Sequence, residues 1–125
     1  MRTESFGSVK IFWPLYSREV LIEKLREYIP ALSKSLPLER VVLFGSWAQG
    51  RATVRSDIDL LVVYRGDPRD DAYSTVRRAF DIRGIEAHVY TQQEAKQVQS
   101  TIDRMIEGGV VLFSQSRPSY IPLKN

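Results

Sequence analysis

Two aspartates stand one residue apart at the head of an apolar run in the middle of the chain. Asp57 and Asp59 open the segment "DIDLLVVY", residues 57–64. Since side chains alternate faces along a strand, both carboxylates would point the same way, with Cα atoms about 7 Å apart. Burying such groups is costly unless a cation or hydrogen bonds compensate the charge. The carboxylate pair therefore predicts a metal site, and its oxygen ligands suit Mg²⁺ or Mn²⁺.

A glycine-serine pair follows the preceding apolar run, "RVVLFG", residues 40–45. Gly45 allows close approach of the backbone, and Ser46 could open a short helix, whose free N–H groups would attract a phosphate. Metal ions that bridge phosphate oxygens are the general arrangement for phosphoryl or nucleotidyl transfer. The two neighbouring motifs together predict that kind of chemistry.

A third carboxylate on a neighbouring strand would complete a two-metal site. Glu86 in "GIEAHVYT", residues 84–91, is the candidate, and it shares a strand face with His88 and Tyr90. The alternative is an edge-strand carboxylate that faces water.

The segment "GSWAQGRATVRSDIDLLV" resembles the signature of the minimal nucleotidyltransferases (MNT) of the DNA polymerase β superfamily, in particular the MntA-like antitoxin group. The similarity is tight over about residues 41–64, and the order of elements stays compatible to about residue 107. The positions that fall in register are Gly45, Ser46, Gly50, Ser56, Asp57 and Asp59.

The resemblance implies a polymerase β-like nucleotidyltransferase fold and a Mg²⁺- or Mn²⁺-dependent attack on the α-phosphate of an NTP, with ATP as the expected donor. Gly45 and Ser46 would hold the triphosphate, and Asp57 and Asp59 would ligate metal. Glu86 would take the third carboxylate role and is a candidate to accept the proton of the attacking hydroxyl. That position is more often Asp in the group, so this chain departs from the usual pattern.

The same resemblance implies a partner. Members of the group are commonly paired with a helical HEPN protein, often as antitoxin to its toxin, and some transfer AMP to a tyrosine of that partner. Nucleic acid is not expected as the direct substrate. Two alternatives stay open: a weak or inactive nucleotidyltransferase-like module that neutralises a partner by binding it, which Glu86 and the small size favour, and a nucleotidyltransferase that acts on a small molecule.

Several nearby side chains leave two interpretations open. Arg51 could pair with the triphosphate or be a solvated loop arginine, and Ser56 could orient Asp57 through a hydrogen bond or begin the strand. His88 could contact a phosphate or an acceptor, or lie on the sheet beneath a helix. Trp47 could stack on a base or pack against the sheet.

The elements that position these residues follow from apolar spacing. Ser17 is a candidate N-cap for a helix that Pro30 should kink or end. Strands are predicted over residues 40–45, 57–64, 85–91 and 110–114. The inner positions of the first helix are expected to be Val20, Leu21, Leu25, Tyr28, Ile29 and Leu32.

Two further helices are expected. One begins after "GDPRDD" and ends at Gly84, with Tyr73, Val76, Ala79 and Phe80 inward. The other opens at a capping box formed by Thr91 and Glu94, and Gly108 and Gly109 stop it. Its inner positions are expected to be Ala95, Val98, Ile102, Met105 and Ile106. The predicted fold class is α/β (α+β), a small mixed sheet with helices packed on it.

Composition bounds the remaining possibilities. The 125 residues, with 43% hydrophobic and 26% charged residues, indicate one globular domain, with an arm over about residues 1–16 and a tail over about 116–125. The absence of cysteine excludes disulfides and thiolate metal sites. No signal peptide or membrane span is recognisable, so we expect a cytoplasmic protein. The net charge of +3 suits a phosphate-bearing ligand.

Overall fold

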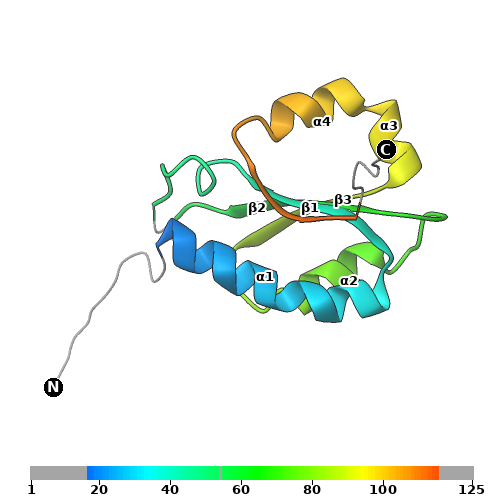
Figure 1. The fold of residues 1–125 in the computed structure, drawn as a ribbon, viewed down its shortest axis with the longest axis horizontal. Coiled ribbons are helices and arrows are strands. Elements are labelled where there is room, and N and C mark those ends of the chain that lie inside the picture. Colours follow the sequence, from blue (N-terminus) through cyan, green and yellow to red (C-terminus); the bar gives the residue numbers. More distant parts are fainter. Residues whose placement is uncertain (1–16, 54, 116–125) are drawn as a thin grey trace, which may run out of the picture.

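The computed structural model describes residues 17–53 and 55–115, which form a four-stranded sheet with helices on both faces (Figure 1). The strand order is β3-β2-β1-β4. The two central strands pair antiparallel, β4 pairs antiparallel with β1, and β3 runs parallel to β2. The predicted mixed sheet is therefore confirmed. The strands are β1 (Leu38–Phe44), β2 (Ile58–Tyr64), β3 (Ile85–Thr91) and β4 (Val110–Ser114).

Within the described residues, four helices cover the sheet. The helices α1 (Arg18–Ser35) and α2 (Ala72–Ala79) lie on one face, and α3 (Gln92–Gln97) and α4 (Gln99–Met105) lie on the other. Since both faces of the central strands are covered, β1 and β2 bury nearly every residue, as their continuous apolar runs predict. None of the described helices combines the length and the apolar character that crossing a bilayer requires.

The described side chains form two apolar cores, one on each face of the sheet. The larger core lies between the sheet and the pair α1 and α2. The smaller core lies beneath α3 and α4 and consists of Val42, Phe44, Leu61, Val63, Ala95 and Ile102.

The helix α1 begins as predicted but does not end at its proline. The Ser17 hydroxyl accepts a hydrogen bond from the Val20 N–H at 3.1 Å, and Val20 itself, expected to face inward, is 48% exposed. Of the two outcomes expected at Pro30, a kink or an end of the helix, the end is wrong, because the helix runs on to Ser35. A proline inside a helix costs about 3 kcal/mol. Burial of Leu32 and then Leu36, each worth about 1.5–3 kcal/mol, offsets that cost.

The last helical segment is two short helices rather than one. The capping box is confirmed: Thr91 Oγ1 accepts from the Glu94 N–H at 3.0 Å, and a Glu94 carboxylate oxygen accepts from the Thr91 N–H at 2.8 Å. The helix then breaks at Val98, whose φ of −121° and ψ of 34° are not helical. The break brings Ala95 and Ile102 onto the sheet and leaves Val98 38% exposed, contrary to expectation.

Other boundaries shift by a few residues. The first strand begins earlier than predicted, and β2 begins at Ile58, so Asp57 precedes it. The helix α2 stops at Ala79 rather than reaching Gly84, and Tyr73 is 51% exposed instead of buried. The predicted N-terminal arm, about residues 1–16, and the predicted C-terminal tail, about residues 116–125, lie outside the described residues.

Candidate active site

The sheet topology brings the end of β1 and the starts of β2 and β3 to one edge. Because β1 and β2 are antiparallel, the last residue of β1, Phe44, pairs with Asp59 near the start of β2. Because β3 runs parallel to β2, Glu86 pairs with Asp59 from the other side. Gly45, Asp59 and Glu86 are thereby neighbours, although they span 41 positions of the sequence.

The close approach predicted at Gly45 is made by the carboxylate of Asp59. Gly45 has a φ of +79°, and a Cβ placed on it would lie 2.5 Å from Asp59 Oδ2, where ordinary contacts begin at 3.4 Å. A left-handed backbone and a missing side chain are both properties of glycine. Gly45 therefore makes room for one oxygen of Asp59.

The other oxygen of Asp59 faces His88. His88 Nε2 lies 3.8 Å from Asp59 Oδ1, and the imidazole packs against Phe44 with ring centroids 5.2 Å apart. Burial raises the pKa of the Asp59 carboxyl above its ordinary value of 3.8. His88 opposes that rise, whereas the like charges of Asp57 and Glu86 add to it. Asp59 is thus a constrained carboxylate with two acidic neighbours.

The donor atoms at this edge have the chemistry of a hard divalent cation site. Asp57 and Glu86 are exposed and Asp59 is 26% exposed, so all three remain accessible. The like charges that raise the pKa of Asp59 are those a divalent cation would neutralise. Across residues 17–53 and 55–115, however, no group of three or more His, Asp or Glu side chains is gathered closely enough to hold a metal ion. The donor set fits Mg²⁺ or Mn²⁺, and the side chains do not form a closed cage.

The segment after Gly45 forms successive turns, so the expected short helix at Ser46 is absent. The Gln49 N–H donates to the Gly45 carbonyl at 3.2 Å, and the Arg51 N–H donates to the Ser46 carbonyl at 2.8 Å. Positive φ angles at Gly45 and Gly50 prevent a regular helix from extending across this stretch. Among described atoms, the N–H groups at positions 46, 47 and 48 find no acceptor, which leaves three successive donors.

Two other predicted nucleotide contacts have local partners. The Ser56 hydroxyl accepts from the Thr53 N–H at 2.8 Å and closes a turn, so it neither begins β2 nor bonds to a described atom of Asp57. The Arg51 guanidinium donates to the side-chain carbonyl of Gln49 and remains exposed.

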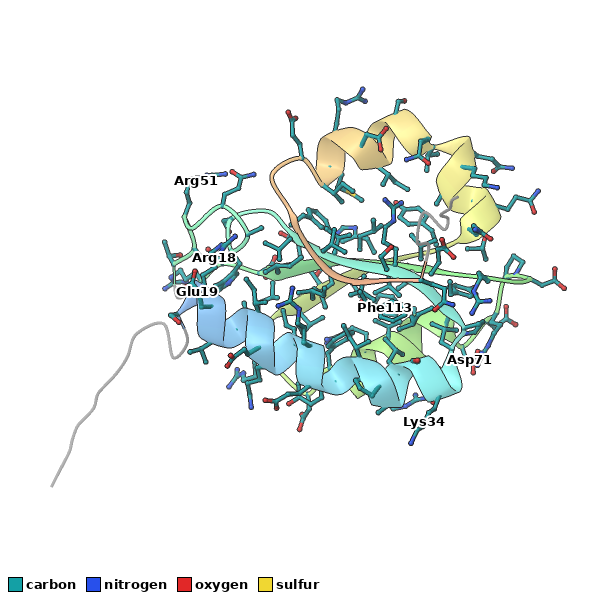
Figure 2. All side chains as sticks on the ribbon, viewed as in Figure 1. Arg18, Glu19, Lys34, Arg51, Asp71 and Phe113 are labelled. Atoms are coloured by element: carbon teal, nitrogen blue, oxygen red, sulfur yellow. The ribbon has the colours of Figure 1, made fainter. Side chains whose placement is uncertain are left out.

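A positioning contact that sequence reasoning missed joins α1 to this loop. Arg18 Nε donates to the Ala48 carbonyl at 2.8 Å, and Figure 2 shows Arg18 at the start of α1, on the side of the loop that carries Arg51. Trp47 is 7% exposed and belongs to the larger core, which favours packing over stacking on a base. No sequence pattern links Arg18 to a carbonyl 30 residues away.

Comparison with known proteins decides the family. The model of the family described as the nucleotidyltransferase domain matches residues 22–112, which run from most of α1 to the first three residues of β4. The chain belongs to the nucleotidyltransferase domain family. Asp57, Asp59 and Glu86, which together form the acidic edge of this nucleotidyltransferase domain, therefore lie inside the matched region.

Solved structures agree with this nucleotidyltransferase fold. A Sulfolobus solfataricus protein described as a candidate nucleotidyltransferase is 25% identical with a TM-score of 0.57, over 79% of this chain and 85% of that one. A structure described as a toxin-antitoxin with AMP-PNP is 20% identical with a TM-score of 0.53, over 73% of this chain and 74% of that one. No curated protein matches the chain.

Proposed function

We propose that this nucleotidyltransferase domain transfers AMP from ATP, in a Mg²⁺- or Mn²⁺-dependent reaction, to a hydroxyl of a HEPN-type partner protein, for which it acts as the antitoxin. The observation that carries the proposal is the placement of Asp59 between Gly45 and Glu86, beside Asp57. The resemblance of the Gly-Ser and Asp-x-Asp motifs to MNT antitoxins supports the choice of donor and partner.

Each residue has a definite part in this proposal. Asp57, Asp59 and Glu86 would hold the cation, which supplies charge neutralisation for the triphosphate when bound. The free N–H groups of the turn that starts at Ser46 would bind phosphate oxygens, as successive backbone donors do. Arg51 would add a charge at the rim of the same loop.

The proposed chemistry is a single displacement at phosphorus. The acceptor hydroxyl oxygen bonds to the α-phosphorus, and the bond from that phosphorus to the bridging oxygen of the β-phosphate breaks. Pyrophosphate leaves with that oxygen, and the hydroxyl proton passes to the Glu86 carboxylate.

The direct test is labelling of a partner. The chain would be incubated with α-labelled ATP, Mg²⁺ and the protein encoded by the adjacent gene, and we expect label on that protein. The double variant Asp57→Asn with Asp59→Asn should lower labelling at least about 100-fold, since it removes two of three acidic groups.

The matched control is Asp67→Asn with Asp70→Asn, which changes the charge equally at two exposed positions of the turn after β2. It should label at the native rate. Equal labelling by the two double variants would contradict the assignment of the acidic edge as the active site.

One observation favours a second candidate, a binding module without turnover. Among the described side chains no cage for a metal is closed, and Asp59 lies beside His88 instead. In that case the Asp57→Asn and Asp59→Asn double variant would still bind and neutralise the partner, and the native chain would transfer no label.

A further inference from the structure

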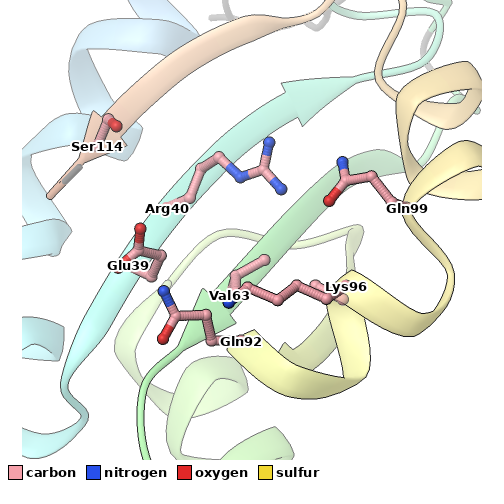
Figure 3. A pocket seen from close by; sticks show the side chains of 8 residues that line it. Glu39, Arg40, Val63, Gln92, Lys96, Gln99 and Ser114 are labelled. Atoms are coloured by element: carbon pink, nitrogen blue, oxygen red, sulfur yellow. The ribbon is translucent and has the colours of Figure 1, made fainter. Parts of the chain in front are cut away.

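A pocket of about 350 Å³ opens between the sheet and the helices α3 and α4 (Figure 3). Its volume falls at the lower end of the range of about 300–1,000 Å³ that is typical of small-molecule sites. Its apolar lining consists of Val63 and Ala95, and its charged lining consists of Arg40, Lys96 and Glu39. The charged side chains leave one positive charge in excess.

Arg40 is an unusual residue for its position on the sheet. It lies on the central strand β1 and on the same face as Val42 and Phe44, which are both buried in the smaller core. Arg40 is only half-exposed, yet its guanidinium forms no hydrogen bond or ion pair with any described residue. An uncompensated charge that is partly removed from water is costly, so a bound anion would stabilise it.

A second cation reaches the same space from the helix above. Lys96 extends from α3 over Val63, and Arg40 and Gln99 point toward one another (Figure 3). Lys96 also makes no ion pair within the described part of the chain. Arg40 and Lys96, 56 residues apart in the sequence, therefore bring two unpaired cations to the lining of one pocket, where the Gln99 amide adds a neutral donor.

The pocket is separate from the acidic edge. Arg40 precedes Phe44, the partner of Asp59, by four residues along β1, which corresponds to about 13 Å. The buried side chains of Val42, Leu61 and Ile102 lie beneath the same helices and belong to the core between the two places.

We propose that this pocket binds a small organic molecule that carries an oxyanion group, a carboxylate or a phosphate. The Arg40 guanidinium holds the oxyanion in a two-point hydrogen-bonded pair, and Lys96 adds a point charge. Gln99 supplies a neutral donor, and Val63 and Ala95 receive the apolar part of the molecule. The site does not depend on nucleotidyl transfer.

The experiment uses the full chain without divalent cation and with EDTA present, so that no metal recruits the anion. Inorganic phosphate and succinate, one phosphate and one carboxylate probe, are each titrated while backbone amide shifts are followed by NMR. We expect saturable shifts at Val63, Ala95 and Gln99 with at least one probe. At ten times its dissociation constant that probe should raise Tm by about 5 °C.

Charge-matched variants test the assignment. Arg40→Gln and Lys96→Gln should each weaken binding of the probe at least about 10-fold. The affinity of Arg40→Lys should lie between that of these two variants and that of the native chain. Arg104→Gln removes the same charge from an exposed position of α4 and should bind as the native chain does. Since Lys96 is exposed, its variant stays informative even if Arg40→Gln unfolds.

Three results would overturn the proposal. They are the absence of saturable binding with both probes, equal weakening by Lys96→Gln and Arg104→Gln, and shifts confined to the turn at Gly45 and Ser46. Partner labelling is measured separately, so failure of this site leaves the proposed transfer reaction untouched.

Discussion

Replacement of Gly45 by alanine tests the geometry of the acidic edge most directly. The new Cβ would lie 2.5 Å from Asp59 Oδ2, against at least 3.4 Å for an ordinary contact, so the carboxylate or the loop must move by roughly 0.9 Å. The φ of +79° adds about 1–2 kcal/mol of backbone strain. Overpacking against Asp59 adds about 1–3 kcal/mol.

These contributions can be separated with a matched glycine. Gly66 has a φ of +97°, and a Cβ on it would meet nothing within 4 Å, so Gly66→Ala carries the backbone strain without a clash. Chemical denaturation should show that Gly45→Ala loses about 1–3 kcal/mol more than Gly66→Ala. Partner labelling by Gly45→Ala should fall about 100-fold, as a displacement near 1 Å does in an active site, and Gly66→Ala should keep the native rate.

A double-mutant cycle completes the test. In an Asp59→Ala background the clash with Oδ2 is gone, so Gly45→Ala should cost no more stability than Gly66→Ala does. The reasoning is refuted if Gly45→Ala and Gly66→Ala lose equal stability in the native background, or if the cost of Gly45→Ala is the same with and without Asp59.

Three further expectations concern other parts of the fold. Because the pKa of Asp59 is raised in the folded state, native stability should fall as pH rises from the ordinary value of 3.8 through the raised one. Asp59→Asn should lack that slope in denaturation series at several pH values and raise Tm near neutral pH. Gly109→Ala should lower the free energy of unfolding by about 1–3 kcal/mol, since its Cβ would lie 2.8 Å from two backbone carbonyl oxygens. The neighbouring variant Gly108→Ala is the control. Its φ is +77° and its Cβ would meet only a side chain at 3.7 Å, so it should show backbone strain alone. Arg18→Gln removes the bond to the Ala48 carbonyl and should lower the rate of partner labelling at unchanged circular dichroism; an unchanged rate would show that this contact does not position the loop.

Local patterns predicted the elements well where one interaction decides the structure. The strands followed from apolar runs bounded by turn residues, and the capping box at Thr91 and Glu94 has the expected reciprocal hydrogen bonds. The sequence also suggested that Glu86 shares a strand face with His88. That Glu86 lies directly opposite Asp59 depends on the register of a parallel pair, which the crossover connection between β2 and β3 must set and which no local pattern gives.

Predictions were wrong where distant contacts outweigh local preference. Pro30 disfavours helix locally, but the buried leucines that follow it maintain α1. The break at Val98 depends on how α3 and α4 lie on the sheet, and apolar periodicity carries no such information. Close approach at Gly45 was foreseen as a property of glycine, whereas the identity of the approaching group, Asp59 Oδ2, required the pairing of β1 with β2.

The mixed sheet has a consequence for the order in which its strands pair during folding. The antiparallel strands β1 and β2 follow one another in the chain, so we expect them to pair early in folding. The strand β3 pairs with β2 only through a crossover connection, so we expect it to join the sheet later. An early intermediate would already hold Asp59 against Gly45 yet lack Glu86. A newly synthesised chain should therefore complete its set of three carboxylates only in the last steps of folding. Pulse-labelling hydrogen exchange should show that the amides of β3 gain protection after those of β1.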